Sequence, residues 1–222
     1  MLLFCIIHFK KLLIMKHSYT KFMLIICLLF ALTAKAQVHL GFHNLALTSD
    51  LSFATPKNEM ANYYSIGDAM KLYLDADLSL LRIQYGKNSP VSFDASAFLG
   101  YEKANFDPAY YVCNGLDAKL TSFGVRLKPF DIGDKGHFLT SLLSGIFVEI
   151  GKSKARLIEA DQPDVIRHPN VFGYGIKPAI PLGEKTNFIF EFAFRNYNWI
   201  NNSNTTSTIH TFRTGLGLQF IF

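Results

Sequence analysis

Apolar and polar residues alternate along most of the chain after residue 37, and helical spacing is scarce. The clearest case is the segment 188–195, where four phenylalanines occupy the even positions, with Glu191 and Arg195 among the odd ones. Successive residues of a strand point to opposite faces, so this alternation predicts a strand with one apolar and one polar face. The end of the chain repeats the pattern, with large apolar side chains at most even positions from Phe212 to Phe222.

Eight segments of this kind are predicted as strands. They are about Val38–Phe53, Met70–Ile83, Val91–Lys103, Leu116–Lys128, His137–Gly151 and Val171–Ile180, then the segment around Phe188–Phe194 and the terminal segment 211–222. In the first of them the alternation changes phase near His43 and Asn44. A change of phase predicts a β-bulge, which inserts one residue into the strand.

The connections between these segments alternate in length. The long ones are 54–69, 104–115, 152–170 and 198–209, and the short ones are 85–90, 129–136 and 181–185. Short periplasmic turns and long outer loops are typical of bacterial outer-membrane barrels. An even number of strands places both termini on the short-turn side, so we expect the N- and C-termini to be periplasmic.

The first 36 residues differ from the rest. Lys16 and Lys21 precede an apolar run over 22–32, which is too short to span a bilayer as a helix. Thr33-Ala34-Lys35-Ala36 follows and supplies small residues at the two positions that a signal peptidase reads. This order predicts a signal peptide over 1–36, cleaved after Ala36, with Met15 as its expected true start and 37–222 as one barrel domain. An uncleaved membrane anchor is the alternative.

Removing this segment changes the charge. It holds five of the 22 basic residues and no acid, so 17 basic and 17 acidic residues remain and the net charge is zero. The basic pI therefore belongs to the leader, and we expect no nucleic-acid partner. Only Cys113 remains of three cysteines, so no internal disulfide can form. The chain shows no Cys/His metal spacing, and we expect no cofactor and no metal.

Alternation does not decide which face of a closed sheet is outside. A soluble lipocalin-like barrel would enclose a cavity lined by Phe188, Phe190, Phe192 and Phe194. An eight-stranded barrel has little room for so many large rings, and the other face carries charges of both signs that can pair inside. We therefore predict an all-β fold, an eight-stranded antiparallel up-and-down transmembrane β-barrel.

Two sets of side chains follow from this orientation. The charge network predicted for the lumen comprises Asp75, Asp77, Asp94, Asp117, Lys119, Arg126, Glu149, Glu191, Arg195 and Arg213, with Lys71 and Lys128. The aromatic girdle expected at the membrane interfaces comprises Tyr63, Tyr64, Tyr110, Tyr111, Tyr197, Trp199, Phe220 and Phe222.

The chain ends on Gly217-Leu218-Gln219-Phe220-Ile221-Phe222. With this ending and the eight alternating segments, the chain resembles the small OmpA/OmpX-type outer-membrane barrels, especially the stand-alone versions of Bacteroidetes-like bacteria. The resemblance implies that Gly217, Phe220 and Phe222 form the signal read by the barrel-assembly machinery. Because the sequence ends at Phe222, we expect no peptidoglycan-binding domain of the kind attached to larger members.

The function expected from these features is structural or interactive: a monomeric barrel in contact with outer-membrane lipids, whose long loops face outside partners. Some eight-stranded barrels act on lipid A, and a lipid-modifying enzyme is one alternative. The histidines after residue 36 are His39, His43, His137, His168 and His210, and none lies in a His-x-Ser pattern on a strand. We therefore expect no catalysis. The other alternative is a soluble carrier of apolar ligands, and the sequence leaves open whether the lumen conducts.

Overall fold

The computed structural model describes residues 37–222 apart from 68–70, 86–90, 111–113, 133–137 and 202–203. The predicted signal peptide over 1–36 lies outside the described residues. Nearly all of the described chain is antiparallel β-sheet. In the described part, no helix is both long and apolar enough to cross a bilayer.

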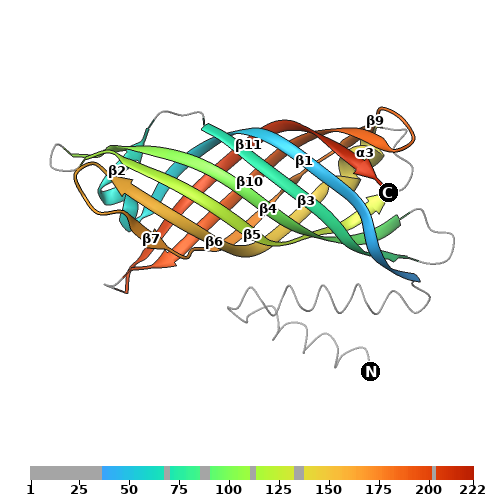
Figure 1. Cartoon of the computed structure of the whole chain (residues 1–222), viewed down its shortest axis with the longest axis horizontal. Coiled ribbons are helices and arrows are strands. Elements are labelled where there is room, and N and C mark those ends of the chain that lie inside the picture. Colours follow the sequence, from blue (N-terminus) through green and yellow to red (C-terminus); the bar gives the residue numbers. More distant parts are fainter. Residues whose placement is uncertain (1–36, 68–70, 86–90, 111–113, 133–137, 202–203) are drawn as a thin grey trace, which may run out of the picture.

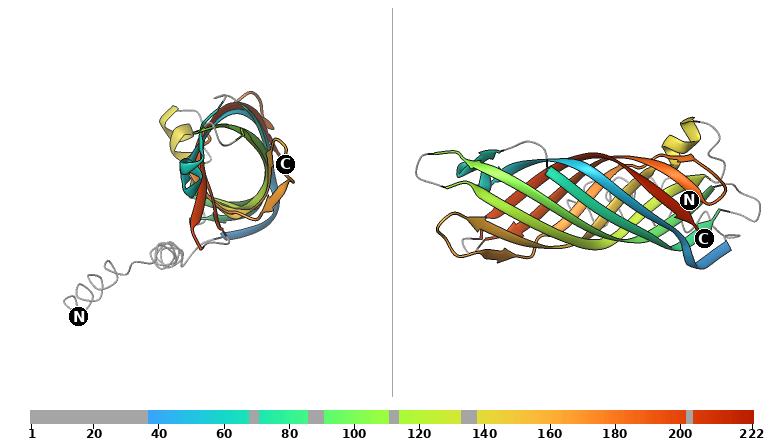
Figure 2. Two further views of the ribbon diagram at one scale, coloured as in Figure 1. Left: turned by 90° about the vertical axis from the view of Figure 1, so that its left-hand side faces the viewer. Right: turned by 45° about the horizontal axis from the view of Figure 1, so that its top comes forward.

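Eight long strands form a closed, hydrogen-bonded ring (Figures 1 and 2). They are β1 (Gln37–Asn58), β3 (Lys71–Gln84), β4 (Val91–Pro108), β5 (Leu116–Ile132), β6 (Ile146–Glu159), β8 (Asn170–Ile176), β10 (Thr186–Ile200) and β11 (Thr206–Ile221). Each pairs antiparallel with its neighbour in the sequence, and β1 pairs with β11 from Asn44↔Ile221 to Asn58↔Ser207. The ring therefore leaves no long strand without two partners.

Short elements extend both ends of the ring. At the end with the long connections lie η1 (Glu59–Asn62), β2 (Tyr64–Ile66), which pairs with β4, and β7 (Val165–Arg167), which pairs with β6. At the opposite end lie α3 (Phe138–Ser144), β9 (Ala179–Pro181) and the C-terminus (Figure 1). The connections predicted as long thus lie at one end of the ring, the long-loop end, and those predicted as short lie at the other, the short-turn end. Their lengths do not alternate as predicted: because the strands extend into the predicted loops, the connections 109–115 and 201–205 are shorter than 133–145 and 177–185.

The alternation predicts correctly which side chains face outward. On β10 the odd positions from Asn187 to Trp199 are buried inside the ring, while Phe192 and Phe194 are 44 % and 48 % exposed on its outer surface. Rings on the outer surface also contact each other across strands, with centroids 5.6 Å apart for Tyr174 and Phe194 and 5.0 Å for Phe194 and Phe212. The cavity lined by β10 phenylalanines that a lipocalin-like carrier requires does not form.

The predicted bulge in the first strand is present. The pairing of β1 with β3 shifts register between Leu40 and Asn44. Gly41 lies in this stretch with φ of +149°, a backbone conformation that favours glycine because it has no Cβ. The shift explains why the apolar phase changes between Phe42 and Leu45.

The predicted strand His137–Gly151 is wrong in its first half. Residues 138–144 form α3, and β6 begins only at Ile146. Leu139, Leu142 and Leu143 have the spacing of three and four residues that gathers side chains on one side of a helix. The predicted strand Val171–Ile180 is also divided, because Lys177 and Pro178 separate β8 from β9.

Several strands continue into segments predicted as loops. β1 runs to Asn58 and β4 to Pro108, while β6 runs to Glu159. These extensions lengthen the wall at the long-loop end of the ring (Figure 1).

Candidate functional site

Charged side chains fill the middle of the lumen. They come from five strands and from the residue that follows β8, and each is at most 7 % exposed. This central charge cluster comprises Asp75, Asp77, Arg126, Lys128, Glu149, Lys177, Glu191, Arg195 and Arg213. Alternation explains the convergence, because every one of these residues lies on the inward phase of its strand.

Glu149 is the hub of the central charge cluster. Its carboxylate accepts hydrogen bonds from three guanidinium groups, at 2.8 Å from Arg126 Nη2, 2.5 Å from Arg195 Nε and 3.2 Å from Arg213 Nη2. Arg195 Nη2 adds a second bond at 2.8 Å, so the Arg195–Glu149 pair is bidentate. A Cβ on Gly173 would stand 2.3 Å from Glu149 Oε1, so only glycine leaves room for the carboxylate there.

The remaining acids complete the network. Arg126 Nη1 lies 2.8 Å from Asp75 Oδ2 and 2.7 Å from Asp77 Oδ2. Lys177 Nζ lies 3.2 Å from Asp75 Oδ2 and 2.7 Å from Glu191 Oε2. Buried charges are tolerated when they are paired, and each of these charges has an oppositely charged partner within 3.2 Å.

Aromatic rings pack against the guanidinium groups. Arg126 lies over Phe147 with its Cζ 4.6 Å from the ring centroid, and Arg213 lies over Tyr73 at 4.2 Å. Arg195 lies 4.9 Å from the centroid of Phe98. These cation–π contacts add to the stability of the cations away from water.

Most of the predicted lumen charges are in this cluster, and two predictions are wrong. Asp117 and Lys119 lie on the outer phase of β5, together with Phe123 and Val125, because the strand continues without a bulge through these positions. Asp94 is inside but forms a separate pair near the start of β4, with Arg82 Nη2 at 3.1 Å. The side chain of Lys71 lies outside the described part.

Three further charged residues point into the lumen but are not in the charge network predicted from the sequence. Each lies on the inward phase of its segment, as the predicted lumen charges do. Lys177 follows the alternation of β8, and Glu102 accepts a hydrogen bond from Tyr197 Oη at 2.7 Å. Asp50 is 1 % exposed, and neither of its carboxylate oxygens has a hydrogen-bond partner. Alternation along β1 from Leu45 onward would have placed Asp50 inside.

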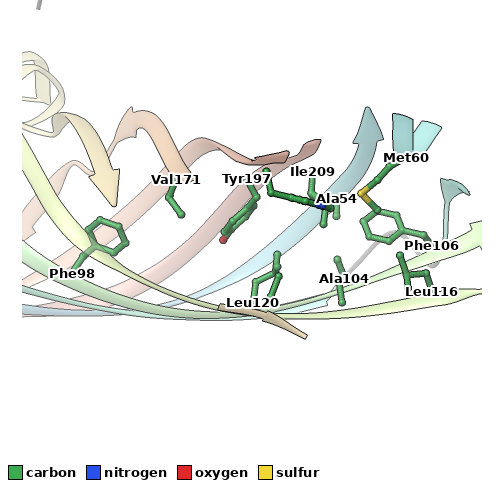
Figure 3. Close-up of a cluster of buried hydrophobic side chains, with 13 residues drawn as sticks. Ala54, Met60, Phe98, Ala104, Phe106, Leu116, Leu120, Val171, Tyr197 and Ile209 are labelled. Atoms are coloured by element: carbon green, nitrogen blue, oxygen red, sulfur yellow. The ribbon is translucent and has the colours of Figure 1, made fainter. Parts of the chain in front are cut away.

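An apolar cluster occupies the lumen between the central charge cluster and the long-loop end. It extends from Phe98 through Leu120 and Tyr197 to Phe106 and Met60 (Figure 3). The inward face of the strands was predicted to be polar, and these apolar side chains in the half of the lumen toward the long-loop end correct that prediction. These side chains fill the lumen toward the long-loop end, in the way that a packed core fills the interior of a soluble protein.

This cluster also corrects the predicted aromatic girdle. Tyr197 and Trp199 are 0 % and 7 % exposed and lie inside the ring, whereas Tyr63 and Tyr110 are on the outer side or in loops and are exposed. Tyr197 is two residues from the inward Arg195, so its phase already excluded an outward position. Tyr111 lies outside the described residues.

Above the apolar cluster, the long-loop end holds a pocket of about 480 Å³. We call it the mouth pocket, and residues from η1, β2, β5, β6, β7, β10 and β11 and from the segments beside them lie around it. Its lining includes Glu59, Met60, Tyr63, Tyr64, Leu116, Leu157, Glu159, Asp164, Val165, Arg167, Trp199 and Asn201. The volume falls in the usual range for small-molecule sites, and the lining mixes apolar and aromatic side chains with four charged and three uncharged polar ones.

Hydrogen bonds between loops hold one side of the mouth pocket. The Glu59 carboxylate accepts hydrogen bonds from Asn201 and Thr205, which tie η1 to the β10–β11 connection. These two donors favour the charged form and lower the pKa of Glu59 below its ordinary value. Asn201 Nδ2 also donates to Ser207 Oγ at 2.7 Å.

The predicted assembly residues lie at the short-turn end of β11. Phe222 is exposed, and its backbone N–H donates to His43 O at 3.1 Å. Phe220 is partly exposed and pairs with Leu45 and Thr186. A Cβ on Gly217 would stand 2.1 Å from Leu47 O, which gives this glycine a packing reason of its own.

The histidines do not form a hydrolase-like arrangement in the described part. No described histidine ring is hydrogen-bonded to a hydroxyl or carboxylate, and His43 Nε2 contacts the His39 carbonyl oxygen at 3.1 Å. His137 is outside the described residues. Within the same limits, no group of three or more His, Cys, Asp or Glu residues could hold a metal ion.

Comparisons with known proteins give structural neighbours but no family. No family model matches the chain, and no curated protein matches it. Neisserial surface protein A (NspA) is 12 % identical, with 80 % of this chain and 97 % of that chain covered and a TM-score of 0.42. Ail, the attachment invasion locus protein of Yersinia pestis, solved with the heparin analogue sucrose octasulfate, is 13 % identical over 82 % and 100 %, with a TM-score of 0.44.

The outer membrane protease OmpT from Escherichia coli is 7 % identical over 86 % of this chain and 100 % of that chain, with a TM-score of 0.38. The neighbours are thus outer-membrane β-barrel proteins. Because the TM-scores are below 0.5, these likenesses carry no argument about function.

Proposed function

We propose that this protein is an eight-stranded up-and-down β-barrel of the bacterial outer membrane, with a structural or surface-interaction role. The observation that carries the proposal is the distribution of polarity across one closed ring. Large apolar side chains lie outside, and paired charges lie inside. That distribution is the reverse of a soluble domain, in which charged residues are mostly exposed.

The outer belt supports membrane insertion. Leu74, Leu99, Phe123, Phe192 and Phe194 are each between 44 % and 58 % exposed on the outside of the ring. Contiguous apolar patches of this extent are rare on soluble monomers. A closed ring also satisfies the backbone N–H and C=O groups that lipid cannot.

Features at the two ends of the ring support one orientation in the membrane. In this orientation the short turns and both termini lie in the periplasm. The helix α3 at this end exposes Leu139 and Leu143, which lie one turn apart. Such an apolar helix face fits the boundary between the hydrocarbon core and the periplasm. The mouth pocket and the long loops then face outside, where an extracellular partner can reach them.

The C-terminal strand supports delivery by the barrel-assembly machinery, through Gly217, Phe220 and Phe222. Phe222 forms only a backbone hydrogen bond near the end of the ring and exposes its ring. Deleting Phe222 is expected to lower the amount of barrel in the outer membrane several-fold while leaving refolding of the purified protein into detergent unchanged. Deletion of Leu182, an exposed apolar residue at the same end, tests whether any lost apolar side chain has this effect. Equal losses for the two deletions would contradict the assembly role.

The filled lumen supports a role without transport or catalysis. The central charge cluster and the apolar cluster occupy the interior, and an eight-stranded interior is only wide enough for its own side chains. Single-channel recording of the refolded protein is expected to show no steady conductance. A stable open level would contradict a closed lumen.

The primary test is the behaviour of the full chain in cell fractions. We expect the protein in the outer-membrane fraction, monomeric, with a gel mobility that changes on heating because a closed barrel resists unfolding by detergent. Mature protein in the soluble periplasm without detergent would overturn the proposal and favour a soluble carrier.

A further inference from the structure

We propose that the mouth pocket binds a small amphiphilic cation, a molecule with an apolar or aromatic body and one protonated amine. The inference deepens the proposed surface-interaction role by giving its site a ligand class, and it rests on that role for its biological setting. Its physical basis is the combination of an apolar floor with an excess of carboxylates at the rim.

The floor of the pocket is apolar. Met60 and Trp199 belong to the apolar cluster of the lumen and also line the pocket, together with Leu116 and Leu157. Trp199 is 7 % exposed, so most of its surface is packed within the apolar cluster below the pocket. An apolar ligand body entering here would replace water on these side chains, which is favourable in proportion to the area covered.

The rim carries more negative than positive charge. Three lining residues are acids, namely Glu59, Glu159 and Asp164, and Arg167 is the one lining base. Asp164 is already paired, because Arg156 Nε donates to its Oδ2 at 2.5 Å. Of the remaining two acids, neither is paired with a lysine or arginine of the described part.

Hydrogen bonds position these two carboxylates without neutralising them. Glu159 accepts a hydrogen bond from Tyr64 Oη at 3.4 Å, and Glu59 accepts from Asn201 and Thr205. Three lining acids and one lining base give a net charge of about minus two, and about minus one remains once Asp164 is set against its partner Arg156. A single cationic group complements that charge, and the faces of Tyr63, Tyr64 and Trp199 offer additional cation–π contacts.

The chain supplies its own probe for binding. Trp199 is the only tryptophan in the sequence, so the tryptophan fluorescence of the refolded full-length protein reports on this pocket alone. The probe ligands are 2-phenylethylamine, its uncharged counterpart 2-phenylethanol and the anion 3-phenylpropanoate. We expect a saturable change with the amine, affinity lower by about fivefold or more for the alcohol, and no saturation with the anion.

Two substitutions with opposite expected effects test the charge argument. Glu159→Gln is expected to weaken binding of the amine about fivefold, and Arg167→Gln to strengthen it by a similar factor, with the alcohol unaffected by both. Glu184→Gln, an exposed acid in the turn before β10 at the other end of the ring, is the matched control and should change neither. Unchanged Trp199 emission without ligand shows that each variant retains the pocket.

Three results would overturn the inference: no saturable change with the amine, equal affinity for amine and alcohol, or equal effects of Glu159→Gln and Glu184→Gln. Binding is measured in detergent, and localisation is measured in cell fractions. The inference can therefore fail while the barrel remains in the outer membrane, and the proposed localisation can fail while the pocket still binds the amine.

Discussion

Glu149→Gln removes the one carboxylate that three buried guanidinium groups share. Arg126 keeps Asp75 and Asp77, and Arg213 keeps Glu191 with its Nη2 3.4 Å from Oε1. Arg195 loses its carboxylate partner and keeps a hydrogen bond to Tyr197 Oη at 3.3 Å. The variant therefore leaves a fully buried cation without a counter-charge.

These contacts set the expected loss in the free energy of unfolding. Removing one partner of a buried ion pair typically destabilises a protein by about 3–5 kcal/mol. The glutamine side-chain oxygen can still accept one hydrogen bond, so we expect a loss near the lower end, about 3 kcal/mol. The measurement is urea unfolding of the protein refolded into phospholipid vesicles, followed by the fluorescence of Trp199.

Asp50→Asn is the matched control, since it makes the same chemical change at a buried lumen carboxylate without a hydrogen-bond partner. It should cost less than about 1 kcal/mol, because no described pair is broken. The double variant Glu149→Gln/Arg195→Met should be less destabilised than the sum of its single variants, by about 2 kcal/mol, since the orphaned cation is gone. The reasoning is refuted if Glu149→Gln costs no more than Asp50→Asn, or if the double variant is additive.

Other contacts give further predictions. Gly173→Ala should destabilise the barrel by about 1–3 kcal/mol in the same unfolding assay, because its Cβ meets the shared carboxylate; an unchanged unfolding midpoint would argue against a tightly packed cluster. Phe194→Arg should cost about 2–4 kcal/mol in vesicles if its position faces hydrocarbon, and no loss would count against the lipid-facing belt. Asn201 and Thr205 lower the pKa of Glu59, so their contact stabilises the fold above the unfolded-state pKa of about 4.3, and this contribution is lost as pH falls through the lower folded-state pKa. Acidification should thus erase the stability difference between the wild type and Glu59→Gln, and a difference that persists at acid pH would refute that origin.

The alternation of residues was enough to predict most of the wall of the ring. The segments around β3, β4, β10 and β11 were placed correctly, and the face of each was correct where the phase was followed. Four predictions are wrong because they follow residue type, whereas the structure follows the phase of the strand: Asp117, Lys119, Tyr197 and Trp199. In an uninterrupted strand the phase has a period of two and is not altered by charge or aromaticity.

The helix α3 lies in a stretch whose sequence pattern fits both a strand and a helix. Leu142 alternates with Ile146 and Val148, which favours a strand, while Leu139, Leu142 and Leu143 have helical spacing. Both patterns fit the same short stretch, and seven residues are too few for propensity to decide. The contacts of α3 with β5 and β9 at the end of the ring favour the helix.

The sequence by itself therefore determined which residues face the two sides of the sheet, since this depends only on neighbours along the chain. Tertiary structure alone decided that Glu149 contacts three arginines, that the Asp50 carboxylate has no hydrogen-bond partner among the described residues, and that an apolar cluster separates the charges from the mouth pocket. Those outcomes depend on the register between strands far apart in the sequence. That register is set by closure of the ring, which no single segment encodes.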